Sequence, residues 1–224
     1  MPIAPWVISH SQRKLSHTLS WALLLNRINQ QALAMKNNDV KPNSESSLDL
    51  PAPSLRAQQV KQRNTQLAKV ANDFATSVQT DAFSARGELV REIFDRLQVE
   101  SDLTWPEHAR LCVGLGDIRA RDGLLRMLHD APELRGQVLS HLIREVGRAE
   151  QDFVAPLATV YAGIAWLEGE SDLTRLAVDH ALQIDSTYSL AQLLDIALRH
   201  NVPPSVWSSS LAAVSFDACL RGAA

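Results

Sequence analysis

Apolar residues recur at helical spacing along most of the chain. The clearest stripes run over Leu89–Leu97 and Leu134–Val146, where apolar side chains three or four positions apart share one face. The stretches Leu15–Lys36 and Leu55–Val78 keep the same period with more polar residues between the apolar ones. We therefore predict helices over these four stretches, and the residues 37–54, rich in Asn, Ser and Pro, predict a linker.

Residues that start and end helices divide the stretch Pro156–Trp207 into three further predicted helices. The first opens at the proline and ends at Gly169, which can take the left-handed conformation. Ser171 or Asp172 caps the second helix, and Pro203-Pro204 stops the third. The short connection at Gly169 makes the first two helices antiparallel neighbours.

The spacing within this hairpin resembles one half of a tetratricopeptide repeat. Gly169, Ala181 and Asp185 stand where that repeat has its Gly, Ala and Asp, with Ser186 at the place of its proline. The motif of the repeat's first helix is out of register, so the spacing indicates a single degenerate unit and not an array.

Three aromatic residues accompany the hairpin. We expect Trp166 and Trp207 to be packing residues that close it, with stacking on a ligand as the alternative. A groove around Trp166, Tyr188 and Trp207 is the candidate surface for a protein or peptide partner.

The densest polar cluster follows the helix that Thr104 and Glu107 are placed to cap. Residues Asp117, Arg119, Arg121 and Asp122 share a predicted helix, with Asp117 and Arg121 spaced i,i+4 and Arg119 and Asp122 spaced i,i+3. The cluster is a candidate site for anion binding or acid–base chemistry. The alternative is an N-cap with a buried ion pair, which we favour because no nucleophile stands nearby.

Catalytic and metal-binding patterns are not found in the sequence. Gly114-Leu-Gly116 lacks the preceding strand and the third glycine of a dinucleotide loop. His108 and Cys112 are spaced i,i+4, but the remaining histidines offer no companion pair for a zinc site, so we expect Cys112 to be a core residue. We expect no metal and no cofactor.

Composition and charge limit the class of protein, its cellular compartment and its possible binding partners. The chain is 46% hydrophobic and 21% charged, as soluble globular proteins are, and its two cysteines favour a reducing cytoplasm. No apolar run reaches the ~18 residues that span a bilayer. The stretch 55–78 has four bases and one acid, which indicates either a nucleic-acid-binding helix or, as we favour, a solvated face. Residues 151–224 carry three bases and eight acids, which disfavours nucleic acid there.

Several segments together resemble a known family. These are Asp117–Asp122, Ala155-Pro156, Ala165–Gly169, Tyr188–Ala191 and Pro203-Pro204. Over roughly Ser54 to Trp207 the chain resembles the C-terminal part of an actinobacterial family known only as domain of unknown function 4192. The strand-bearing N-terminal half of that family is not matched by residues 1–53. The resemblance implies a helical fold and carries no established activity.

We therefore predict an all-α protein, with an N-terminal helix and flexible linker over residues 1–53 and a helical domain over residues 54–224. The leading functional hypothesis is a non-catalytic interaction or scaffold module with a protein or peptide partner, or one that forms homo-oligomers. The alternative is an anion-binding protein or enzyme that uses the Asp117–Asp122 cluster. Nucleic acid is the weakest hypothesis, and no membrane is expected.

Overall fold

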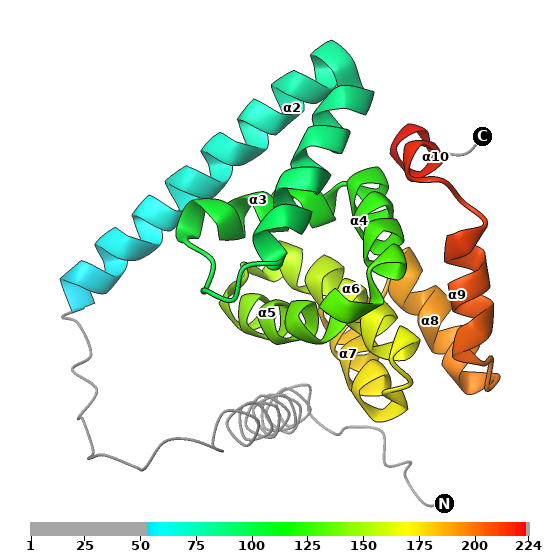
Figure 1. Cartoon of the computed structure of the whole chain (residues 1–224). Helices are drawn as coiled ribbons and strands as arrows, with labels where there is room; N and C mark the ends of the chain where they lie inside the picture. The colour runs from blue at the N-terminus through cyan, green and yellow to red at the C-terminus, as the bar shows by residue number, and fades with distance from the viewer. Residues whose placement is uncertain (1–52, 223–224) are drawn as a thin grey trace, which may run out of the picture. The chain divides into compact units, whose positions relative to one another are not determined.

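The computed structural model describes residues 53–222, which belong to one compact unit, Ser47–Ala224. Every regular element among these residues is helical, so the predicted all-α class is confirmed for them (Figure 1). The expected helix Leu15–Lys36 and most of the expected linker lie outside the described residues. None of the described helices is both long enough and apolar enough to cross a membrane.

Helix α2 (Pro53–Leu97) combines two helices that the sequence predicts separately. At Asp81 the backbone leaves the helical region, with φ −150° and ψ 93°. The Asp81 carboxylate accepts hydrogen bonds from the backbone N–H groups of Phe83 and Ser84, both at 3.1 Å, and so caps the second half. Figure 1 shows this second half turning back sharply from the first.

Helices α3 (Trp105–Gly116) and α4 (Ile118–Asp130) follow, with a short 3₁₀ turn (Pro132–Leu134) before α5 (Arg135–Arg148). The predicted start of α3 is confirmed, because Thr104 is its N-cap and the Glu107 carboxylate accepts the Thr104 N–H at 2.7 Å.

Helix α6 (Gln151–Leu167) is the centre of the core. Every residue from Val154 to Trp166 is buried, and α6 packs against α3, α4, α5, α7, α8 and α9. Pro156 lies inside this helix, so the prediction that it opens the helix is wrong. A proline in a helix interior costs ~3 kcal/mol. Here burial on all sides of α6 offsets that cost. Helix-capping and helix-breaking residues in the sequence do not reveal this burial.

The predicted hairpin is formed by α6 and α7 (Ser171–Ile184). Gly169 has φ +77° as expected. The N-cap of α7 is Glu170, which precedes both predicted caps, Ser171 and Asp172. Helix α8 (Ser189–Arg199) follows, and α9 (Pro204–Ala212) begins at the second proline of the predicted stop.

The last helix, α10 (Phe216–Arg221), packs on α4 and α2 through Leu220, which is fully buried. Two glycines make room for this side chain. A Cβ at Gly87 would lie 3.3 Å from Leu220 Cδ1, and a Cβ at Gly123 would lie 3.0 Å from Leu220 Cδ2. The chain beyond α9 is thereby fixed beside α4.

A candidate binding cleft

A cleft of about 690 Å³ lies between α4, α8, α9 and α10. Its size falls within the range of roughly 300–1,000 Å³ that is typical of ligand pockets. Most of the side chains that line it are apolar. They include Ile118, Leu125, Leu190, Leu193, Leu211 and Val214.

Arg121 and Asp122 line one part of the cleft. Arg121 donates from Nε at 2.9 Å and Nη2 at 2.7 Å to Oδ1 of Asp122, and from Nη1 at 2.9 Å to the Tyr188 hydroxyl. The Arg121 side chain is 5% exposed and that of Asp122 is 42% exposed. Burial alone would lower the pKa of Arg121, but the Asp122 carboxylate and Tyr188 raise it above its ordinary value. The guanidinium is therefore held charged.

Asp117 has a structural role beside this cleft. Its carboxylate accepts the backbone N–H groups of Arg119 at 2.9 Å and Ala120 at 3.0 Å, which makes it the N-cap of α4. Arg86 from α2 donates its Nε to both Asp117 oxygens at 3.0 Å. The predicted pairing of Asp117 with Arg121 is therefore wrong, because Arg86 takes the carboxylate.

Arg119 is the exposed cation of the cleft. Its predicted i,i+3 pairing with Asp122 is not formed, since Arg121 binds that carboxylate. The guanidinium lies against Gly222, where an added Cβ would be 2.7 Å from Nε. Within residues 53–222 no carboxylate forms an ion pair with Arg119, whereas the three neighbouring arginines have one each. Those pairs are Arg86–Asp117, Arg121–Asp122 and Arg126–Asp130.

The aromatic residues contribute in different ways. Trp207 lines the cleft and donates its Nε1–H to the Gly163 carbonyl at 3.1 Å. Its ring stacks on Trp166 with centroids 6.1 Å apart, and Trp166 itself is 3% exposed. Tyr188 meets the cleft through its bond to Arg121. The structure thus brings Arg119, Arg121 and Asp122 of the polar cluster into one lining with Trp207 of the predicted groove. Asp117, Tyr188 and the buried Trp166 are not among the residues that line the cleft.

The lining of the cleft also contains a thiol. Cys219 is the thiol in its lining, and burial, together with the Asp122 carboxylate, raises the pKa of that thiol. No histidine is among the described residues that line the cleft.

Comparison with known families assigns the chain. A family model described as "Domain of unknown function (DUF4192)" matches residues 31–205. The chain belongs to the DUF4192 family. The match begins before Ser54, where the expected resemblance starts, and it ends just inside α9. No curated protein and no solved structure matched this DUF4192 chain. Its likeness to a tetratricopeptide repeat stays a prediction.

A second polar cluster in the DUF4192 fold is buried between α3 and α5. His108 Nδ1 lies 2.5 Å from Oε2 of Glu145, and His108 Nε2 lies 3.4 Å from the Cys112 sulfur. Arg148 donates to the other Glu145 oxygen at 3.0 Å. Cys112 is 1% exposed and burial raises its pKa, so it is a core thiol as expected. The sequence shows the His108–Cys112 pair but gives no signal for Glu145.

A third polar cluster, Ser208, His129 and Asp130, is linked in the same order as the serine, histidine and aspartate of a hydrolase triad. Ser208 Oγ lies 2.9 Å from His129 Nε2, and Asp130 Oδ1 lies 3.3 Å from His129 Nδ1. However, Arg126 pairs with Asp130 and also approaches Nδ1 at 3.3 Å. Ser208 sits in the middle of α9, where its backbone N–H belongs to the helix and cannot form an oxyanion hole. We therefore assign these contacts to the packing of α4 on α9. No group of three or more metal-ligating side chains occurs among residues 53–222.

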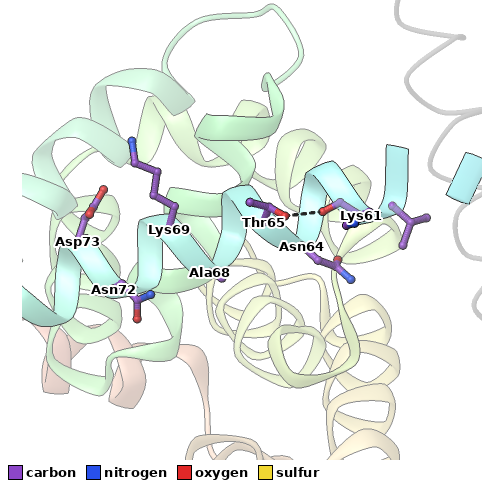
Figure 2. A pocket seen from close by; sticks show the side chains of 8 residues that line it. Lys61, Asn64, Thr65, Ala68, Lys69, Asn72 and Asp73 are labelled. Atoms are coloured by element: carbon purple, nitrogen blue, oxygen red, sulfur yellow. Dashed lines mark hydrogen bonds between the residues drawn. The ribbon is translucent and has the colours of Figure 1, made fainter. Parts of the chain in front are cut away.

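A larger hollow of about 980 Å³ follows the first half of α2. Figure 2 shows its labelled side chains, from Lys61 to Asp73, along this one helix, with the Thr65 hydroxyl donating to the Lys61 carbonyl at 2.9 Å. All the described residues that line it belong to α2, so within the described part of the chain it is the face of one helix. Lys61 and Lys69 are exposed on it, in keeping with the solvated face that the sequence favours.

Proposed function

We propose that the protein is a non-catalytic helical binding module, and that the cleft receives an amphipathic helix of a partner protein. One observation carries the proposal. The apolar lining of the cleft continues outward onto Ile118 and Leu193, which are 57% and 55% exposed. Contiguous apolar surface of this kind is characteristic of sites that bind other proteins.

The exposed rim distinguishes a protein partner from a small ligand. A small molecule inside about 690 Å³ would cover the floor formed by Leu125 and Trp207. It would leave Ile118 and Leu193 largely in water, whereas a longer segment covers floor and rim together. Every regular element of residues 53–222 is helical, so those residues present no sheet edge to an extended peptide. A helix in a groove is therefore the recognition mode that fits.

Site-specific cross-linking tests the proposal. A photoreactive amino acid replaces Leu193 in the full chain, and the matched control carries it at Val60 of α2, which is 49% exposed and lies outside the cleft. In host extract we expect a discrete adduct from position 193 that is missing from position 60. Adding Ile118→Asp should suppress this adduct, because a charge on the rim opposes apolar docking.

Three results would contradict the proposal. Equal labelling at positions 193 and 60 would show non-specific contact. Adducts unaffected by Ile118→Asp would place the contact elsewhere. A dimer in light scattering that Ile118→Asp dissociates would make a second copy of the chain the occupant.

A small anionic ligand is the second candidate function, favoured by the cleft volume and the charged Arg119 in its lining. Thermal-shift screening with phosphorylated metabolites and nucleotides tests it. A stabilisation of the wild type that Arg119→Ala removes would support this candidate, and the absence of any shift would dispose of it.

A further inference from the structure

The rim of the cleft places an apolar side chain next to a charge that pairs with no carboxylate of the described residues. Ile118 and Arg119 are the first two residues of α4, and both are exposed and line the cleft. A partner that covers Ile118 therefore also reaches the guanidinium of Arg119.

Covering that guanidinium has an energetic consequence. Docking removes water from it, and a charged group that loses water without gaining a partner opposes binding. The carboxylates nearby cannot serve, since Asp117 and Asp122 are bound by Arg86 and Arg121. On its other side Arg119 meets Gly222, which has no side chain. Among residues 53–222 no other carboxylate reaches Arg119, so the compensating group comes from the partner.

We infer that Arg119 is the specificity-determining residue of the cleft, and that it selects a partner helix bearing Asp or Glu within one turn of its main apolar anchor. The inference rests on the proposed function. A carboxylate suits a guanidinium because two parallel N–H donors bind its two oxygens. The apolar anchor supplies buried area, and the acid fixes which partner and which register are accepted.

The test is a selection of random 16-residue peptides on the immobilised full chain. Three proteins are compared: wild type, Arg119→Glu and Lys61→Glu. Lys61 is exposed, lies outside the cleft and forms no ion pair with another described residue. It is the matched control because Lys61→Glu changes the net charge by the same amount as Arg119→Glu. Glutamate in the first turn of α4 is favourable to the helix, so Arg119→Glu should fold, as thermal melting verifies.

We expect wild type and Lys61→Glu to enrich the same peptides, with apolar residues at i, i+4 and i+7 and Asp or Glu within a turn of one of them. Arg119→Glu should enrich Lys or Arg there instead. The best wild-type peptide should bind Arg119→Glu roughly tenfold more weakly, and its binding to wild type should weaken as salt rises.

The possible failures are separable. Apolar peptides without an acidic preference, or an acidic preference that persists in Arg119→Glu, would overturn the role of Arg119 and leave the binding cleft standing. No enrichment on any of the three proteins would overturn the binding cleft and this inference with it.

Discussion

The ion pair in the cleft is asymmetric, and this asymmetry predicts which of its members matters more to stability. Arg121 is 5% exposed and Asp122 is 42% exposed. Asp122→Ala leaves a nearly buried guanidinium whose remaining side-chain partner is the Tyr188 hydroxyl. Arg121→Met leaves a carboxylate that water already reaches, and it fills the vacated space with an apolar side chain.

The magnitudes follow from these environments. Breaking a buried pair so that one charge stays unpaired costs ~3 to 5 kcal/mol, and we take ~2 to 3 for Asp122→Ala because Tyr188 remains. An ion pair with one solvated member contributes ~0 to 1 kcal/mol, so Arg121→Met should cost about 1 kcal/mol or less. The double variant should resemble Arg121→Met, because no unpaired guanidinium is left.

Urea unfolding followed by circular dichroism measures the three free energies, with an unchanged denaturant slope as the control for a two-state transition. The expected order is wild type, then Arg121→Met and the double variant, then Asp122→Ala. If Arg121→Met destabilised as much as Asp122→Ala, or if the double variant were the least stable, then Asp122 would not be what stabilises the buried Arg121.

Two further predictions concern the core. Gly114→Ala should be ~1 kcal/mol or more less stable than Gly136→Ala, because a Cβ added at Gly114 would lie 2.6 Å from Cδ1 of Ile93 and force that buried side chain to shift. A Cβ added at Gly136 would meet no described group outside its own helix within 4 Å, so Gly136→Ala should stabilise by up to ~1 kcal/mol. Equal shifts in the free energy of unfolding would refute the packing argument. Burial, and then the charge of Arg144, lower the pKa of His141 below its ordinary value. As the pH falls below ~6.5, His141 therefore takes up a proton more readily in the unfolded chain than in the folded one, and the stability of the fold declines. His141→Gln should reduce this decline between pH 6.5 and 5, and an unchanged slope would exclude His141 as a cause.

Local sequence signals predict local structure in this protein. The capping of α3 at Thr104 and the left-handed Gly169 follow from residue types within one turn of each other. Pro156 fails the same reasoning, because its place inside α6 depends on burial by six other helices. Capping and helix-breaking residues therefore predict a helix end where contacts within one turn determine it. They do not predict it where tertiary packing overrides these local contacts.

The contacts of the cleft show the same limit. Helical spacing places Asp117 and Arg121 on adjacent turns and indicates a pair, but Arg86, 31 residues earlier, takes Asp117. Arg121 likewise meets Tyr188, 67 residues later. The first partner is set by how α2 packs on α4, and the second by where the fold places Tyr188, the N-cap of α8. No sequence spacing encodes either arrangement. The sequence therefore identifies the polar cluster, and only the fold identifies its pairing.

The two sides of the cleft differ in their relation to the family match. Helices α4 and α8, with Arg119, Arg121 and Asp122, lie inside the matched residues 31–205, whereas Trp207, Leu211 and Val214 lie beyond them. Two contacts hold the part of the wall beyond the match in place. Leu220 packs against Gly87 and Gly123, and Arg126 Nε donates to the Val214 carbonyl at 2.7 Å. The side inside the match supplies the charged groups, and the C-terminal helices supply much of the apolar wall. Under the proposed function, charge selection by Arg119 and apolar affinity at Trp207 are therefore separable, and substitutions at the two positions should change different properties of binding.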